Sequence, residues 1–557
     1  MTLNIKTSAT IAYKDIFSED DKPNADDLLA DIPSNSILTI VAHFMAQIHS
    51  REDDFMLQKE IFLRWINQQS NDTRIELTDK FDEIAEKHNE NVNFFNNITS
   101  LYFYQVVFSN YHDGDDRHLT AEEELRLIKA YLLVSEKWTE KEIEHLSQRP
   151  QDDAEMVRYV LPFQMTHNEI QSYKDFRPQL LKALHFFQFI EQDETLKEYL
   201  PEFLGQYRLS NWKEYIKHTI VPYIISLSGS RSTVLVFKEE NKLETDYWDT
   251  FCIEVEGYLS KADFLELREN PVFKLQPLHY LYFNYNFIID KLFQALQFVF
   301  SKLLIEKGVV RNFGDFKSKF YSETFSENYL LYKTIEHCIA NQNKIVSLNG
   351  EELSEKLGEK GPDYYIRVNN HILIIEFKDV LMGAGSKVSY DFGQISAEIN
   401  KKLVQNENGK PKGVGQLSKF INNIPENGYD FDKVEEDNLI FYPLLLVTDS
   451  AFSLFGINYL LENEFRAQLQ ENNKREIKHL SLLNFDTLLM FQDLFNKSRV
   501  NFFDLLIGYD YNQKQGNYKF QNLGNYFIDY INYHRIPSRD MPDELRKFIT
   551  EDLIYKK

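Results

Sequence analysis

The sequence predicts an α+β protein in which a large, mainly helical N-terminal region precedes a smaller α/β module. Three observations lead to this prediction. Glycine and proline are few, 20 and 15 in 557 residues, which favours long uninterrupted helices. Apolar residues recur at helical spacing from about residue 36 to residue 217. Between residues 316 and 500, apolar strands instead alternate with helices, which marks a separate module.

The overall charge is strongly acidic. The chain carries 62 lysine and arginine residues against 86 aspartate and glutamate residues, a formal net charge of −24 at pH 7. Because duplex phosphates repel an acidic surface, this balance argues against a protein that coats DNA without specificity. It is compatible with a nucleic-acid enzyme whose binding groove has its own local charge.

The composition also indicates the compartment. Hydrophobic residues make up 43% and charged residues 27%, as in an ordinary globular protein. The two cysteines, Cys252 and Cys338, have no metal-type spacing, which excludes a disulfide framework and favours a reducing compartment. The N-terminus lacks a secretory signal pattern, and the most apolar stretch, residues 281–305, contains too many polar side chains to span a membrane. We therefore expect a soluble cytoplasmic protein.

The N-terminal region begins with an irregular acidic segment and continues as helices. Thr120 and Glu123 match a capping box ahead of an apolar helical run. Residues 232–238 and 250–256 are rich in β-branched residues, which predicts two strands of a small sheet. Helix is expected again at residues 281–307.

The module that follows combines helices and strands. Its expected elements are a helix at 324–342, strands at 364–368 and 371–378, a glycine-containing loop at 383–386, helices at 390–405 and 414–424, and a strand at 439–448. Residues 451–557 are mostly helical by pattern. The expected domains are a regulatory, sensor or oligomerisation region at 1–315, the α/β module at 316–500 and a helical C-terminal extension at 501–557.

A predicted β-hairpin places two acidic residues opposite each other. Asn369-Asn370 separates two apolar runs, and asparagine tolerates the positive φ that a two-residue turn requires. In such a hairpin, residues equally distant from the turn face each other, so Asp363 pairs with Glu376. Their Cβ atoms would lie about 4.5–5.5 Å apart. Two carboxylates this close are tolerated when they are solvated or when a cation lies between them.

The chemistry expected at this pair is that of a divalent cation. A site built only from oxygen ligands suits Mg²⁺ or Mn²⁺, which keep water ligands and share their coordination with a substrate phosphate. Lys378 follows Glu376 by two residues, so both side chains project from the same face of the strand. A lysine there can orient or help deprotonate the attacking water and stabilise the extra negative charge on phosphorus. We therefore predict Asp363, Glu376 and Lys378 as catalytic residues.

Pro362-Asp363 followed by Glu376-Phe377-Lys378 resembles the signature of the PD-(D/E)xK nuclease superfamily, which includes restriction endonucleases. The resemblance covers only part of the α/β module. It implies a restriction-endonuclease-like core with elements in the order αβββαβ. It also implies that Asp363 and Glu376 hold Mg²⁺ or Mn²⁺, that the backbone carbonyl of Phe377 assists them as a metal ligand, and that Lys378 is the catalytic lysine.

The same resemblance implies two further site residues. The family often adds an acidic residue from the preceding helix; Glu327 is the first choice, just inside a helix opened by Thr324 or Ser326, and Glu323 is the second. A glutamate favoured by the helix dipole is the structural alternative. Many relatives also carry a glutamine on the following helix, which Gln416 matches on the polar face of an amphipathic segment. Gln416 would then act in catalysis by touching the phosphate or the attacking water.

Lysines near the predicted site form a local basic patch, with five of them between residues 398 and 419 against two glutamates. Such a patch would offset the repulsion between nucleic acid and an acidic chain. An ordinary solvated loop could have the same composition. The predicted nucleic-acid-binding residues are Lys401, Lys402, Lys410, Lys412 and Lys419.

The function predicted from these residues is metal-dependent hydrolysis of phosphodiester bonds, with DNA favoured over RNA. By analogy with nucleases that carry long extensions, the chain resembles a phage-defence effector whose N-terminal region contacts a partner protein or a second copy. Two alternatives stay open. One is a nuclease-like module that binds nucleic acid or protein without cutting, and the other is a site-specific restriction endonuclease.

Overall fold

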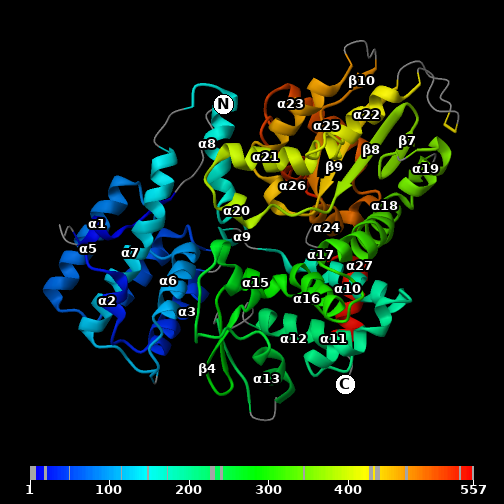
Figure 1. Ribbon diagram of the computed structural model, residues 1–557. Coiled ribbons are helices and arrows are strands. Elements are labelled where there is room, and N and C mark those ends of the chain that lie inside the picture. Colours follow the sequence, from blue (N-terminus) through cyan, green and yellow to red (C-terminus); the bar gives the residue numbers. More distant parts are fainter. Residues whose placement is uncertain are drawn as a thin grey trace. The chain divides into compact units, whose positions relative to one another are not determined.

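The computed structural model shows a mainly helical α+β protein (Figure 1), which confirms the predicted class. Helices hold 60% of the residues and strands 10%, and a mixed six-stranded sheet lies in the C-terminal half. None of the helices in the described part of the chain is long and apolar enough to cross a membrane. The described residues are 8–17, 22–48, 51–114, 116–146, 150–171, 174–225, 233–238, 242–342, 345–359, 361–425, 431–432, 439–470, 475–537 and 541–554.

The chain divides into two compact units that interleave along the sequence. Unit 1 contains Met1–Arg149, His167–Lys174 and Leu204–Ala295, and unit 2 contains Pro150–Thr166, Asp175–Phe203 and Leu296–Lys557. The sequence prediction places one boundary near residue 315. In the structure, the segments 175–203 and 296–315 belong to the same unit as the six-stranded sheet.

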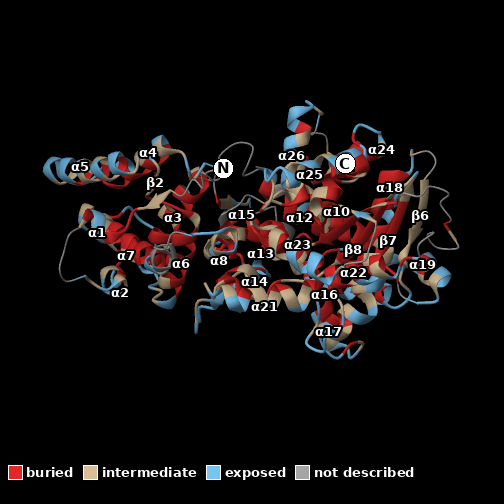
Figure 2. Cartoon of the chain, turned by 90° about the horizontal axis from the view of Figure 1, so that it is seen from above, coloured by how far each residue is buried: buried red, intermediate tan, exposed pale blue. Residues whose placement is uncertain are grey.

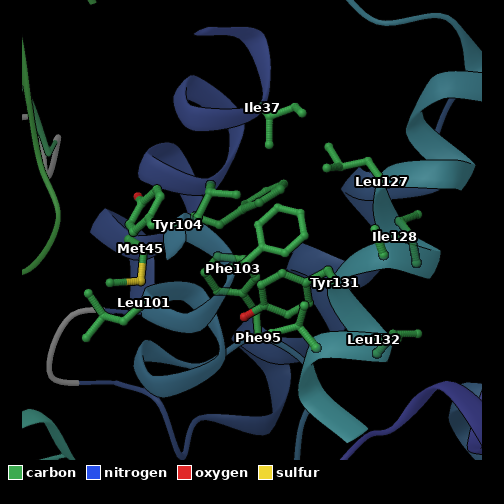
Figure 3. Packing of buried hydrophobic residues seen from close by; sticks show 14 of the residues in the cluster. Ile37, Met45, Phe95, Leu101, Phe103, Tyr104, Leu127, Ile128, Tyr131 and Leu132 are labelled. Carbon is green, nitrogen blue, oxygen red and sulfur yellow. The ribbon is translucent and has the colours of Figure 1, made fainter. Parts of the chain in front are cut away.

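Unit 1 consists of helices around one hydrophobic core (Figure 3). The rings of Phe95 and Tyr131 stack in this core with their centroids 4.9 Å apart. The capping box predicted at Thr120 and Glu123 is confirmed, because the N–H of Glu123 donates to Thr120 Oγ1 at 3.3 Å and the N–H of Thr120 donates to Glu123 Oε2 at 2.8 Å. The helices are α1 (Tyr13–Ile16), α2 (Ala25–Leu29), α3 (Ser34–Ile48), α4 (Phe55–Trp65), α5 (Asn71–Lys87), α6 (Asn97–Ser109), α7 (Ala121–Leu146), α9 (Asn168–Gln171), α12 (Trp212–Ile225), α13 (Lys242–Asp249), α14 (Leu265–Glu269), α15 (Tyr285–Asp290) and the 3-10 turn η3 (Ala262–Phe264).

The small sheets of unit 1 differ from the prediction. The strands are β1 (Ala9–Thr10) paired with β2 (Val92–Asn93), and β3 (Val234–Val236), β4 (Val272–Gln276) and β5 (His279–Tyr282) in the order β3-β5-β4. β3 lies within the predicted strand 232–238. The strand predicted at 250–256 is wrong. The structure describes all of these residues, and only Cys252 among them makes a β-bridge. The helix predicted at 281–307 begins later, at Tyr285, because short apolar runs do not distinguish strand from helix by their period.

Unit 2 is built around the six-stranded sheet. Its strands are β6 (Ile345–Asn349), β7 (Tyr364–Val368), β8 (His371–Lys378), β9 (Ile440–Val447), β10 (Glu476–Ile477) and β11 (Ser481–Asn484). They follow the order β10-β9-β8-β7-β6, and β11 also pairs with β9. β6, β7 and β8 are antiparallel neighbours, whereas β8 and β9 run parallel.

Unit 2 also contains helices, several of which lie beside this sheet (Figure 1). They are α8 (Asp153–Met165), α10 (Phe176–Gln192), η1 (Leu196–Glu198), α17 (Phe313–Phe316), the π-helix η4 (Lys317–Leu331), α18 (Tyr332–Ile339), α19 (Gly350–Leu357), α20 (Ala384–Lys387), α21 (Phe392–Leu403), α22 (Gly413–Asn423), η5 (Ser450–Ser453), α23 (Ile457–Gln468), α24 (Phe485–Asn496), α25 (Phe502–Lys514), α26 (Leu523–Tyr533), α27 (Asp543–Phe548) and η6 (Ile549–Ile554). Two further helices, α11 (Leu200–Gln206) and α16 (Gln294–Glu306), have residues in both units.

The central strands agree closely with the sequence prediction. β7 and β8 confirm the strands predicted at 364–368 and 371–378, and β9 confirms the strand at 439–448 to within one residue at each end. β6 and α19 were not predicted, and the loop expected at 383–386 contains the short helix α20. β6 escapes prediction because it has five residues, all half-buried, and mixes apolar with polar side chains.

Helices cover both faces of the central strands (Figure 2). On one face, Ile372 and Ile374 of β8 share a core cluster with Leu417 of α22. On the other face, Phe377 of β8 packs against Phe485 of α24, with ring centroids 5.1 Å apart. This two-sided burial explains why β8 is a nearly continuous apolar run. Charged residues at the end of this strand are therefore exceptional.

Candidate functional site

The turn between β7 and β8 brings the predicted acidic residues opposite each other. Asn369 adopts a φ of 55°, the positive value that a two-residue turn favours. β7 pairs with β8 in a register that reaches Tyr364 and Ile375, so the next position pairs Asp363 with Glu376. The register predicted from the sequence is confirmed.

Both carboxyl groups are buried, with Asp363 exposing 2% and Glu376 0% of its surface. Oδ2 of Asp363 accepts a hydrogen bond from the backbone N–H of Phe377 at 2.7 Å, and Oε2 of Glu376 accepts one from Nζ of Lys378 at 2.6 Å. Oε1 of Glu376 has no hydrogen-bond partner among the described residues. A buried carboxylate oxygen without a partner is unfavourable unless a proton or a cation binds to it.

Burial and charge oppose the ionisation of Glu376. Its pKa rises to about 8, first because of burial and then because of the negative charge of Asp363, while the Lys378 ammonium acts in the other direction. Burial lowers the pKa of Lys378, but the charges of Asp363 and Glu376 outweigh burial and raise this pKa above its ordinary value. Lys378 therefore stays protonated at neutral pH, and Glu376 ionises more readily when a cation binds beside it.

Lys378 lies on the same side of β8 as Glu376, as the alternation of a strand predicts. Its Nζ atom donates to the backbone carbonyl of Phe377 at 3.1 Å and lies 3.6 Å from Oδ2 of Asp363. Its side chain is 14% exposed, more than either carboxylate. Lys378 is thus the member of this group that a ligand from solvent reaches first.

The donor atoms of this group fit a hard divalent cation. Carboxylate and carbonyl oxygens are the ligands that Mg²⁺ and Mn²⁺ take in proteins, and Asp363, Glu376 and the backbone of Phe377 supply them within one hairpin. Within the described residues, no group of three His, Cys, Asp or Glu side chains is placed to hold a metal ion. Two carboxylates suffice for Mg²⁺, because it keeps several water ligands.

Glu327 lies near the pair without completing a triad. Its Oε1 accepts a hydrogen bond from the Tyr332 hydroxyl at 3.4 Å, and its charge contributes to the raised pKa of Lys378. The Tyr332 hydroxyl also accepts a hydrogen bond from the N–H of Gly350 at 3.1 Å. The pKa of Tyr332 is raised by burial and then by the charges of Glu327 and Asp363. Tyr332 therefore links the helix that carries Glu327 to the start of α19, and it lies close enough to Asp363 to be affected by that charge.

The helix that carries Glu327 begins earlier than predicted. The side chain of Asn312 caps α17, and helical structure then continues through η4 and α18. The prediction that Thr324 or Ser326 opens this helix is wrong, because their hydroxyl groups make other hydrogen bonds. Glu327 is therefore inside the helix, where the dipole of a helix start does not explain it. Glu323, the second choice, is exposed.

Gln416 is half-buried near the start of α22. Its Oε1 accepts a hydrogen bond from the N–H of Gly413 at 3.0 Å, so it caps its own helix. None of the contacts known for the described residues joins Gln416 to Asp363, Glu376 or Lys378. Its role at a phosphate stays a prediction.

Two lysines of the predicted patch form ion pairs with nearby glutamates. Nζ of Lys401 lies 2.5 Å from a carboxylate oxygen of Glu407, and Nζ of Lys402 lies 2.8 Å from one of Glu398. The other predicted lysines are the exposed Lys410 and Lys419 and the half-buried Lys412. The two ion pairs reduce the positive charge that this patch offers to a phosphate backbone, and nucleic-acid binding there stays a prediction.

Two residues of this region are outside the predicted set. Tyr332 contacts Glu327, and Asp379, which directly follows Lys378, accepts hydrogen bonds from η4 and from the end of β9. The position of Asp379 at the end of a buried strand is a signal that the sequence does contain. No comparable signal distinguishes Tyr332 from the other tyrosines, of which the chain has 32 in all.

Comparison with known proteins adds no relative. A scan against protein-family models, a search of curated proteins and a search of solved structures each find no match. Function is therefore inferred from the chemistry and geometry of the site.

Proposed function

We propose that this protein is a metal-dependent nuclease of the PD-(D/E)xK kind. The observation that carries the proposal is the buried pair of Asp363 and Glu376, with Nζ of Lys378 2.6 Å from the second carboxylate. Burying two carboxyl groups and an ammonium opposes folding, and such groups are concentrated at functional sites. The order of elements supports the proposal: helices η4 and α18, antiparallel β6, β7 and β8, helices α21 and α22, and the parallel β9 follow the αβββαβ order, with α19 inserted.

The residues of the site have two roles: some would bind the cation, and Lys378 would stabilise negative charge on the substrate. Asp363, Glu376 and the carbonyl of Phe377 would hold the cation. Bound there, Mg²⁺ or Mn²⁺ would supply a Lewis acid and lower the pKa of a coordinated water. Because the pKa of Lys378 is raised, we assign this lysine the stabilisation of negative charge on the phosphoryl oxygens rather than removal of a proton from water. Its partial exposure makes it the first contact of a substrate phosphate.

Cleavage assays test this proposal directly. Wild type and Glu376→Gln are incubated with plasmid, linear duplex DNA, single-stranded DNA and RNA, in Mg²⁺, Mn²⁺ or EDTA. The control is Glu266→Gln, which changes another buried glutamate, in unit 1, that accepts hydrogen bonds from Tyr258 and from the N–H of Lys261. We expect wild type and the control to cleave in Mg²⁺ or Mn²⁺, with DNA cut faster than RNA. Glu376→Gln should be slower by at least about 100-fold, the scale of transition-state electrostatics.

Two other outcomes have clear meanings. Equal cleavage by wild type and Glu376→Gln, purified in parallel, would refute the site. If neither protein cleaves, but wild type binds Mn²⁺ and Glu376→Gln does not, the chain is a binding module that keeps the cation site.

A further inference from the structure

Asp379 follows the last residue of β8 and accepts hydrogen bonds from two other elements. Its Oδ2 accepts one from Oγ of Ser326 at 2.5 Å, and its Oδ1 accepts one from Oγ1 of Thr448 at 3.1 Å. The Tyr321 hydroxyl lies close to this carboxylate, because the charge of Asp379 adds to burial in raising the pKa of Tyr321. Nζ of Lys317 donates to the backbone carbonyl of Asp379 at 2.9 Å. With its side chain 10% exposed, Asp379 is a nearly buried junction between β8, β9 and η4.

Three of these four neighbours of Asp379 belong to η4, and the wide turn of a π-helix places them on one face. Lys317, Tyr321 and Ser326 follow one another at intervals of four and five residues, which suits a helix whose N–H groups bond five residues back. In an α-helix of about 3.6 residues per turn, the nine residues from Lys317 to Ser326 would make about two and a half turns. Ser326 would then lie on the side opposite Lys317 and could not reach Asp379.

A side-chain contact agrees with this wide spacing. The hydroxyl of Thr324 donates to the carbonyl of Lys319, five residues earlier, at 3.2 Å. π-Helical segments are rare in proteins, usually last a single turn and are frequent at functional sites. The segment Lys317–Leu331 is much longer than one turn, so contacts outside the helix must favour it over the α-helix.

The position of Glu327 depends on the same contacts. Glu327 directly follows Ser326, so the bond from Ser326 to Asp379 determines where this part of η4 lies against the end of β8. Oε1 of Glu327 accepts a hydrogen bond from the Tyr332 hydroxyl at 3.4 Å, this hydroxyl accepts one from the N–H of Gly350 at 3.1 Å, and Gly350 lies against the backbone of Asp363. The charge of Glu327 also contributes to the raised pKa of Lys378. An α-helical turn at this point would rotate Glu327 together with Ser326.

We propose that Asp379 is a positioning residue of the nuclease site: it holds η4 in its π-helical form against the end of β8 and thereby keeps Glu327 at the site of Asp363 and Glu376. The inference rests on the proposed nuclease function. Asp379 acts here through the helix and contacts neither substrate nor cation. Thr448 binds the second carboxylate oxygen, which keeps the first directed at η4.

The test compares Asp379→Asn with Asp449→Asn. Asp449 lies two residues after the end of β9, is 4% exposed, and accepts hydrogen bonds from the N–H groups of Met382 and Ala451 at 2.8 and 2.9 Å. Among the described residues, none of its contacts is with η4. Each variant is measured for Mn²⁺ affinity by titration calorimetry, for kcat and KM on the best substrate, and for its thermal midpoint.

The two variants should differ in function more than in stability. Glu327 is the acidic residue predicted to join the cation site, so its displacement in Asp379→Asn should weaken Mn²⁺ binding about tenfold and lower kcat about 10- to 100-fold with KM unchanged, the scale seen when a group that supports a metal site is lost. Asp449→Asn should keep Mn²⁺ affinity and kcat within a small factor at a similar or greater loss of thermal midpoint. Equal effects of the two variants on Mn²⁺ affinity and kcat would overturn the inference.

A double variant tests whether the effect passes through Glu327. If Asp379 acts by placing Glu327, the two substitutions are not additive. The double variant Asp379→Asn with Glu327→Gln should then bind Mn²⁺ as tightly as whichever single variant has the lower affinity. Multiplied losses would instead mean two independent effects and would overturn the inference. Ser326→Ala and Tyr321→Phe each remove one hydroxyl group beside Asp379, so they replace Asp379→Asn if that variant does not fold. A smaller loss of affinity is expected from each.

Mn²⁺ binding by these variants distinguishes failure of the proposed nuclease site from failure of the positioning role of Asp379. If Glu376→Gln binds Mn²⁺ as tightly as wild type, the metal site itself is refuted. If Glu376→Gln loses binding while Asp379→Asn, Ser326→Ala and Tyr321→Phe keep wild-type affinity, only the positioning role is refuted.

Discussion

Nζ of Lys378 lies 2.6 Å from Oε2 of Glu376, and this contact satisfies only one oxygen of a fully buried carboxylate. The other oxygen has no hydrogen-bond partner among the described residues, and Asp363 is close enough to share a proton with Glu376. One lysine therefore neutralises only part of the charge of two buried acids. Either a proton or a cation can compensate the rest, so protons and metal ions compete for Glu376.

Mn²⁺ affinity should rise with pH up to about 8. Glu376 has a pKa of about 8 and must lose its proton to bind a cation, so each pH unit below that value should weaken binding by up to about tenfold. Above pH 8 the affinity should level off. Calorimetric titrations across this range, in buffers of different ionisation enthalpy, measure both the affinity and the protons released. A constant affinity between pH 6 and pH 8 would contradict the assignment of Glu376 as a ligand.

In EDTA, Glu376 should make the folded protein less stable as pH rises. Its pKa of about 8 in the folded state lies above the ordinary value of 4.5, so the folded state keeps a proton that the unfolded state releases. The stability linked to this proton is full below about pH 4.5 and is lost as pH rises through 8. Glu376→Gln removes this dependence.

The expected result is a difference in thermal stability between the two proteins that grows with pH. Glu376→Gln should nearly match wild type at pH 5 and exceed it by roughly 10 °C or more at pH 8.5, since a pKa raised from 4.5 to about 8 corresponds to about 5 kcal/mol and about 1 kcal/mol shifts the midpoint of a domain of 150–250 residues by roughly 2–4 °C. Circular dichroism melts in EDTA measure both midpoints. A variant less stable than wild type at pH 8.5 would argue that the ionised carboxylate is well compensated by Lys378.

Lys378→Met should separate catalysis from metal binding. Loss of the ammonium should lower kcat by about 10²–10³-fold, because charge on the phosphoryl oxygens loses its partner. The same ammonium lowers the pKa of Glu376, so the pH midpoint of Mn²⁺ binding should move above that of wild type. Lys182→Met, which removes another buried lysine, 2.7 Å from Asp486, is the control. An unchanged pH midpoint in Lys378→Met would show that the two groups are not coupled.

Gly350→Ala should displace residues of the site, because the added methyl group has too little space. A Cβ atom there would lie 2.8 Å from the Tyr332 hydroxyl oxygen and 3.3 Å from the carbonyl oxygen of Asp363, so one of them must move. We expect cleavage to slow by about tenfold or more, since small displacements of catalytic groups are costly. Gly205→Ala is the control, because its Cβ meets nothing within 4 Å and should stabilise α11 by up to about 1 kcal/mol. Full activity of Gly350→Ala would mean that α19 does not constrain the site.

The hairpin of the site could be predicted because its determinants are local. The Asn369-Asn370 turn specifies which residues pair, and the period of two places Lys378 on the side of Glu376. Burial of Ile372 and Ile374 under a helix also follows from the apolar pattern. These features need no knowledge of distant parts of the chain.

The remaining features depend on tertiary contacts. Thr324 and Ser326 have the side chains of helix-capping residues, yet they lie inside a π-helix because Asp379 and the backbone of Lys319 accept their hydrogen bonds. An apolar period of 3.6 cannot indicate such a segment. The bond from Gly413 to Gln416 likewise depends on the local geometry of a helix start rather than on the polarity of a helix face.

The turn that pairs the two acids is far from them. Asn369 and Asn370 lie six residues from Asp363 and Glu376, about 20 Å along each strand. Inserting or deleting one residue in this turn would shift β7 by one position against β8 and move Asp363 to the opposite face of the sheet from Glu376. The number of residues in an exposed loop at the far end of the hairpin thus determines whether the acids can act on one cation, although no atom of the loop touches it.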